Sequence, residues 1–212
     1  MDEKRRASEI LRILKKTYKS KPTTSLSYNN TVQLLVAVIL SAQCTDARVN
    51  IVVRPLFKKY KTAKDFANAD RKTFEKEIRS TGFYRNKAKN IINACKIIDE
   101  QYDGKVPKTM PELLHLPGVA RKTANIVLSE GYGIIDGIAV DTHVTRLSNR
   151  LGFTKHKNPE KIEQDLMQLS PHKDWGEISL RLIWHGRAVC KARKPLCGSC
   201  PVNKLCPSAF SF

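Results

Sequence analysis

Apolar residues recur at helical spacing along most of this chain, and alternating apolar and polar positions bounded by turn residues are nearly absent. The N-terminal run 3–18 gathers its apolar residues on one face, with basic residues around the rest. The segment 31–42 is apolar on every side, which predicts a helix buried at the centre of a bundle. The pattern therefore predicts an all-α protein.

Turn and capping residues give the limits of the remaining helices. Thr109 and Glu112 have the spacing of a capping box, and Asp141 and Asn158 are expected to cap the helices that follow them. We expect further helices at about 46–60, 63–68, 71–79, 86–102, 110–116, 121–130, 142–151, 159–169 and 175–189.

The chain is strongly basic. Lysine and arginine number 38 against 20 acidic residues, a formal net charge of +18 over 212 residues. Because the excess is spread along the chain, it indicates nucleic acid as partner before an anionic membrane, and a soluble protein with a basic surface is the alternative. The charged N-terminus lacks the apolar region of a signal peptide, and no apolar run approaches the ~18 residues of a membrane span. We expect an intracellular protein, cytoplasmic and nucleoid-associated if prokaryotic.

Four of the six cysteines stand in the spacing C-x6-C-x2-C-x5-C. They are Cys190, Cys197, Cys200 and Cys206. In a reducing compartment, this clustering indicates one shared metal centre and not disulfides, and the spacing alone leaves zinc and a 4Fe–4S cluster open. The basic residues between the first two, Lys191, Arg193 and Lys194, are expected to contact phosphate. Cys95 lies on an apolar helical stripe and is expected to be a buried hydrophobe.

The segment LPGVARK, 116–122, predicts a hairpin between two helices, with the sharp turn at Gly118. The start of the second helix presents backbone N–H groups and the positive end of the dipole, which favour phosphate. Lys122 is unusual there, because the dipole disfavours a cation. A nucleophilic lysine needs a depressed pKa, and the helix start and Arg121 supply two of three means, burial being the third. A phosphate-binding lysine and a plain helix cap at Asp141 are the alternatives.

Taken together, these residues resemble the endonuclease III family of DNA glycosylases and abasic-site lyases in the helix-hairpin-helix superfamily. The resemblance covers nearly the whole chain and rests on LLVAVILSAQCTD, GFYRNKAKNI, LPGVARKTANIVL, IAVDTH, LIWHGRAVC and the cysteine spacing. It implies a 4Fe–4S cluster in place of zinc. It also implies two all-α lobes, a six-helix barrel lobe with the hairpin at 24–134 and a cluster lobe at 1–23 plus 135–212, with DNA bound between them.

By the same resemblance, the family's catalytic lysine and aspartate fall on Lys122 and Asp141. The enzyme would flip a damaged pyrimidine out of duplex DNA, and Lys122 would attack C1′ of the deoxyribose while Asp141 stabilises the developing positive charge. A Schiff base and β-elimination would then cut the strand 3′ to the lesion. The implied partner is double-stranded DNA containing damaged pyrimidines or abasic sites. The protein is expected to bind it as a monomer, and no membrane is expected as a partner.

The resemblance also implies DNA contacts. Gln43 matches the residue that fills the gap left by the flipped base, and Phe83 stands where a second wedge, usually leucine, enters the opposite strand. Asp46 and His143 match positions lining the lesion pocket. The hairpin residues expected at the DNA are Gly118, Ala120 and Arg121. Since many members carry glycine in place of Ala120, the backbone there must avoid a positive φ or accept strain.

Two rival functions remain open from the residues. One is a mismatch glycosylase acting on uracil, thymine or adenine, against which Lys122 argues, since relatives of that kind commonly lack it. The other is a non-catalytic DNA-binding module in which the hairpin only holds phosphate. Four histidines are interpreted as structural or exposed, namely His115, His156, His172 and His185.

Overall fold

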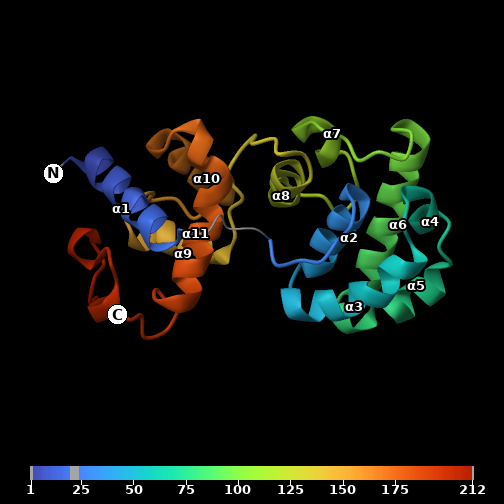
Figure 1. Cartoon of the computed structure of the whole chain (residues 1–212), viewed down its shortest axis with the longest axis horizontal. Helices are drawn as coiled ribbons and strands as arrows, with labels where there is room; N and C mark the ends of the chain where they lie inside the picture. Colours follow the sequence, from blue (N-terminus) through green and yellow to red (C-terminus); the bar gives the residue numbers. More distant parts are fainter. Residues whose placement is uncertain (1, 20–23, 212) are drawn as a thin grey trace. The chain divides into compact units, whose positions relative to one another are not determined.

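The protein is described here from a computed structural model, over residues 2–19 and 24–211. Over these residues the chain is helical and contains no β-strand, which confirms the predicted all-α class. It divides into two compact units, Thr24–Asp136 and Met1–Thr23 with Gly137–Phe212, whose helices are labelled in Figure 1. Within the described ranges, no helix combines the length and apolar character needed to cross a bilayer.

The unit Thr24–Asp136 is built around the helix that was expected to be central. Its elements are α2 (Thr31–Ser41), α3 (Asp46–Lys59), α4 (Ala63–Ala67), α5 (Arg71–Glu77), η1 (Arg79–Thr81), α6 (Tyr84–Gln101), α7 (Met110–Leu114) and α8 (Arg121–Tyr132). Every residue of α2 from 32 to 40 is buried, as predicted. The polar exception, Gln33, is satisfied because its amide donates to the carbonyls of Phe57 and Tyr60.

Capping chemistry in this unit differs from the prediction at one helix. The Thr109 hydroxyl donates to the Glu112 carboxylate and caps no backbone N–H, so the predicted capping box is wrong. A complete capping box forms instead at Thr62 and Asp65, at the start of α4. Spacing alone cannot distinguish these cases, because the hydroxyl can bond either the backbone or the nearby carboxylate.

The second unit contains the N-terminal helix and the C-terminal part of the chain. Its elements are α1 (Glu3–Thr17), α9 (Thr142–Arg150), α10 (Pro159–Leu169), η2 (His172–Asp174), α11 (Trp175–Ala188), η3 (Cys197–Ser199) and η4 (Asn203–Leu205). The predicted caps at Asp141 and Asn158 are confirmed, since each side chain accepts a first-turn backbone N–H.

Arg6 of α1 joins separate segments of this second unit. Its guanidinium donates to the carbonyls of Leu151, Gly152 and Leu205, at 2.7, 3.1 and 3.2 Å. The first two carbonyls end α9 and the third lies in the cysteine segment. Because a guanidinium offers several donors in a fixed fork, one side chain can hold a helix end and a loop together.

Candidate catalytic and cluster-binding residues

The hairpin predicted at 116–120 joins α7 to α8. Gly118 has φ +79°, and a Cβ added there would lie 2.9 Å from the Cβ of Asn90, so both the backbone conformation and the space require glycine. Ala120 is the N-cap of α8 with φ −93° and ψ 168°. This extended conformation is open to any residue, so the alanine is accommodated without strain.

Lys122 is the second residue of α8 and its side chain is exposed. Burial, one of the three means of activating a lysine, is therefore not supplied here. The N-cap Ala120 offers no side-chain acceptor to the first-turn N–H groups of α8, and that turn holds no acidic residue. The helix start thus keeps the electropositive character that favours a phosphate.

Asp141 lies in the other unit, as the N-cap of α9. Its Oδ1 accepts the backbone N–H of Val144 at 2.8 Å, so the capping role is real. Among the described residues, its second carboxylate oxygen accepts no hydrogen bond. One half-buried carboxylate can therefore cap a helix and still present an oxygen to a positive charge.

Gln43 and Phe83, in the first unit, are both exposed and both adopt left-handed backbone conformations, with φ of 54° and 47°. Phe83 is 63% exposed, although an aromatic ring of that size is normally covered. A left-handed conformation is uncommon in a non-glycine residue, and in a bulky aromatic residue such as Phe83 it is a backbone outlier. The two residues therefore share an unusual geometry that sequence patterns did not show.

A buried lysine connects the chain segments that carry these two residues. Lys87 of α6 is 5% exposed, and its Nζ donates to the carbonyls of Leu40 and Thr81, each at 2.8 Å. Leu40 lies near the end of α2, just before Gln43, and Thr81 comes shortly before Phe83. Burial lowers the pKa of Lys87. The sequence analysis missed this residue, although its position one helical turn before the buried Ile91 was a usable signal.

The two expected pocket residues have local partners. Asp46 is the first residue of α3, and its carboxylate accepts a hydrogen bond from the Ser25 hydroxyl. The Nδ1 of His143, in α9, lies 3.1 Å from the Arg146 guanidinium. Because a guanidinium only donates, Nδ1 is the acceptor in this contact. Asp46 belongs to the first unit and His143 to the second.

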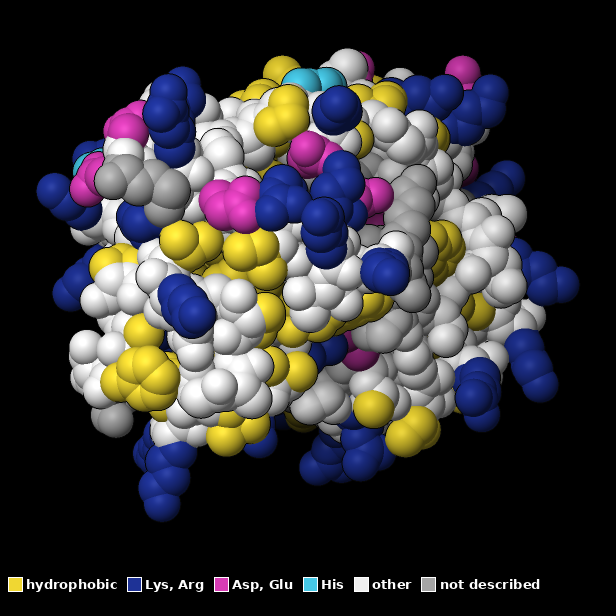
Figure 2. Space-filling view, turned by 60° about the vertical axis from the view of Figure 1, so that its left-hand side comes forward, with side chains coloured by type: hydrophobic (Ala, Val, Ile, Leu, Met, Phe, Trp, Pro, Cys, Tyr) yellow, Lys and Arg dark blue, Asp and Glu magenta, His cyan; other side chains and the backbone are white. Residues whose placement is uncertain are grey.

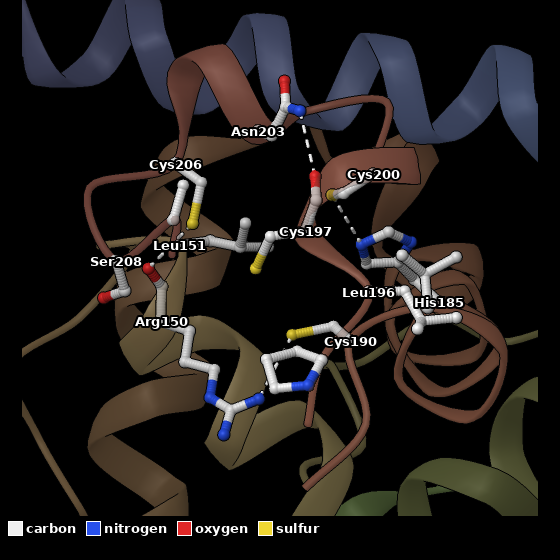
Figure 3. Close-up of a pocket in the computed structure, with 13 residues that line it drawn as sticks. Arg150, Leu151, His185, Cys190, Leu196, Cys197, Cys200, Asn203, Cys206 and Ser208 are labelled. Carbon is white, nitrogen blue, oxygen red and sulfur yellow. Dashed lines mark hydrogen bonds between the residues drawn. The ribbon is translucent and has the colours of Figure 1, made fainter. Parts of the chain in front are cut away.

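The four clustered cysteines line one pocket, and Figure 3 shows their sulfur atoms arranged around it. They are Cys190, Cys197, Cys200 and Cys206. Over the described part of the chain, no three His, Cys, Asp or Glu side chains converge closely enough to hold a single metal ion. In a 4Fe–4S cluster each thiolate binds its own iron, so sulfurs placed around a space fit that group.

A hydrogen-bond donor points at one of the four sulfurs. Arg150 donates to the sulfur of Cys190 at 3.5 Å and also holds the carbonyls of Lys191 and Ala192. Burial raises the pKa of the Cys200 thiol, and a backbone hydrogen bond from Val202 partly offsets it. Burial likewise raises the pKa of Cys206. Because iron takes the thiolate, binding has to displace these protons.

His185 also faces the cysteines. It is fully buried on α11, and its Nε2 lies 3.5 Å from the sulfur of Cys200. Burial lowers the pKa of His185 to about 4. The sequence interpretation left this histidine among structural or exposed residues and missed its place beside the cavity. His115, His156 and His172 are exposed.

The basic loop between the first two cysteines is exposed. Lys191, Arg193 and Lys194 all face solvent, and Lys194 has a left-handed φ of 50°. On the face drawn in Figure 2, lysine and arginine side chains are spread over the surface and not gathered into one patch. Arg150 holds the carbonyls at the start of this loop, so the loop is anchored where it leaves α11.

Known proteins resemble this chain along almost its whole length. Residues 36–172 match the HhH-GPD superfamily base excision DNA repair protein family, and residues 190–206 match the iron-sulfur binding domain of endonuclease III. Endonuclease III of Synechocystis sp. is 60% identical over 207 residues, covering 98% of this chain and 94% of that protein.

Two solved structures of endonuclease III are also similar. One is a non-covalent complex with DNA and the other a trapped covalent intermediate with DNA. Each is 42% identical with a TM-score of 0.93, and each match covers all of this chain and at least 98% of the other.

These similarities confirm that the cofactor is a 4Fe–4S cluster and not zinc. The hairpin between α7 and α8, the cysteine-lined cavity and the similarity over the whole chain lead to one assignment. The chain belongs to the endonuclease III family, the iron-sulfur DNA glycosylases and abasic-site lyases of base excision repair.

Proposed function

We propose that this glycosylase and lyase removes oxidised or otherwise damaged pyrimidines from duplex DNA, with Lys122 as the nucleophile. The observation that carries the proposal is the similarity to an endonuclease III trapped in a covalent intermediate with DNA. A covalent intermediate needs a protein nucleophile. Lys122 is an exposed amine at the start of α8, directly after a glycine-dependent hairpin, and so meets that need.

In the proposed reaction, the lone pair of the Lys122 Nζ attacks C1′ of the flipped nucleotide, and the bond from C1′ to the base breaks with its electrons leaving on the base. Asp141 stabilises the positive charge that develops on the sugar and assists proton transfer. Opening of the sugar ring leaves a Schiff base at C1′. Loss of a C2′ proton and of the 3′ phosphate then cuts the strand.

The proposed DNA contacts follow from exposure and charge. The start of α8, with Gly118, Ala120 and Arg121, binds backbone phosphate. Gln43 fills the gap left by the flipped nucleotide and Phe83 enters the opposite strand, which their exposure and left-handed backbone support. Asp46 and His143 contribute to the lesion pocket. Lys191, Arg193 and Lys194 bind phosphate near the cysteine centre.

The remaining assignments concern the lobes and the cluster ligands. We assign the unit Thr24–Asp136 to the barrel lobe with the hairpin and the other unit to the cluster lobe. The four cysteines around the pocket are the cluster ligands, supported by their shared pocket and by the Arg150 guanidinium that donates to the Cys190 sulfur. The enzyme acts as a monomer, and in a bacterial cell it works in the cytoplasm on the nucleoid, where its substrate lies.

Borohydride trapping tests the nucleophile. Wild-type enzyme should give a covalent adduct with duplex DNA containing thymine glycol, and Lys122→Ala should give none. Lys72→Ala removes a comparable exposed lysine from α5 and should trap like the wild type. Persistent trapping by Lys122→Ala would show that another amine attacks C1′.

Release of thymine glycol, uracil and adenine from matched duplexes tests the substrate class. Preferential release of thymine glycol supports the proposal, whereas preferential release of uracil or adenine favours a mismatch glycosylase. DNA binding with a steep salt dependence but no cleavage of abasic sites would favour a non-catalytic module.

A further inference from the structure

Three side chains of the cluster lobe, distant in sequence, form a continuous hydrogen-bonded row. The Tyr18 hydroxyl, just after α1, lies 3.0 Å from Nδ1 of His185. Nε2 of the same ring lies 3.5 Å from the sulfur of Cys200. Figure 3 shows the second contact at the edge of the cysteine-lined cavity. Both nitrogens of one imidazole are therefore engaged, one by a phenol and one by a sulfur.

The surroundings leave these groups few alternatives. His185 is fully buried and Tyr18 is half-buried. The two rings also meet edge to face, with centroids 6.0 Å apart. Leaving the nitrogens of a buried imidazole without hydrogen bonds destabilises the folded protein, so the ring is held between the hydroxyl and the sulfur.

The chemistry of a ligating sulfur decides the direction of the row. A thiolate bound to iron carries no proton and can only accept, so the contact with Cys200 requires the proton on Nε2. A neutral imidazole then has a lone pair on Nδ1, which can only accept. The Tyr18 hydroxyl must therefore donate to Nδ1.

We propose that Tyr18 and His185 form a hydrogen-bond relay that raises the reduction potential of the 4Fe–4S cluster, with the hydroxyl fixing the tautomer that donates to the Cys200 sulfur. A donor at a cluster sulfur stabilises the additional negative charge of the reduced state, which makes reduction easier. His185 and Tyr18 act as positioning residues and not as catalytic ones. The inference rests on the proposed assignment of Cys200 as a cluster ligand.

Tyr18→Phe in the cluster-loaded enzyme is the test variant, because it removes only the hydroxyl. We expect its midpoint potential, measured by voltammetry, to be more negative than that of the wild type at equal iron content. Tyr132→Phe is the matched control, since the Tyr132 hydroxyl donates to the Val106 carbonyl in the other unit. Its potential should equal that of the wild type. An unchanged potential in fully loaded Tyr18→Phe would overturn the relay.

A second measurement does not depend on how Tyr18→Phe folds. In loaded wild-type enzyme labelled with 15N-histidine, the His185 signals should show a protonated Nε2 and an unprotonated Nδ1. A proton on Nδ1 would refute the relay. Cys200→Ala tests the ligand assignment itself. If this variant loads iron like the wild type, Cys200 is not a cluster ligand and the relay fails as well.

Discussion

Replacing Lys87 with methionine would remove the ammonium group that joins the segments preceding Gln43 and Phe83, while keeping a side chain of similar length. Two buried carbonyls, those of Leu40 and Thr81, would lose their partner. Each unsatisfied carbonyl costs about 1–3 kcal/mol. Part of this cost is offset, because methionine is uncharged and burying it requires no desolvation of an ammonium group. The lowered pKa of Lys87 shows that burial disfavours its charge. We expect the free energy of unfolding to fall by about 2 kcal/mol.

The same substitution should weaken binding of damaged DNA. If Lys87 no longer holds the segments that precede Gln43 and Phe83, these two side chains must become ordered when DNA binds. The entropic cost of this ordering is about 0.5–1.5 kcal/mol for each side chain. Affinity for a duplex with an abasic-site analogue should therefore fall about tenfold, which corresponds to about 1.4 kcal/mol.

Urea unfolding and fluorescence anisotropy at fixed salt measure the two effects. Lys96→Met is the matched control, because Lys96 lies on the same helix but is exposed, and it removes the same charge. If Lys87→Met lost stability but bound DNA as tightly as Lys96→Met, Lys87 would only stabilise the unit Thr24–Asp136 and would not position Gln43 and Phe83 for DNA.

Three other experiments have outcomes set by local geometry. Gly118→Ala should destabilise the protein more than Gly133→Ala. Both glycines have a positive φ, which costs an alanine about 1–2 kcal/mol, but only the Cβ added at Gly118 would clash with Asn90. Equal losses of stability in urea unfolding would contradict this. Asp141→Asn should retain thermal stability, because asparagine caps a helix as well as aspartate does. Its rate of base release should fall about tenfold or more. An unchanged rate would show that Asp141 has no part in the reaction. Burial raises the pKa of the Cys95 thiol to about 12, so iodoacetamide should label Cys95 only after unfolding. The contribution of the buried neutral thiol to the free energy of unfolding should be complete below pH 9 and should be lost as pH rises toward 12. Rapid labelling of the native protein at Cys95 would refute its burial.

Helix positions were predictable because their signals are local. The apolar run of α2 and the caps at Asp141 and Asn158 depend on residues within one or two helical turns. The failed capping box at Thr109 marks the limit, since one hydroxyl had two acceptable local partners. The start of α6 at Tyr84, two residues earlier than expected, follows from the left-handed Phe83 that precedes it.

The sequence by itself determined the helices, the hairpin and the cysteine centre, because periodicity, turn chemistry and ligand spacing are recorded in neighbouring residues. Only the tertiary structure decided the roles of Lys87 and His185. Their partners lie far along the chain, 47 residues away for the Leu40 carbonyl and 167 for Tyr18. No local pattern encodes which distant carbonyl or hydroxyl a buried donor meets, since that depends on how the helices pack.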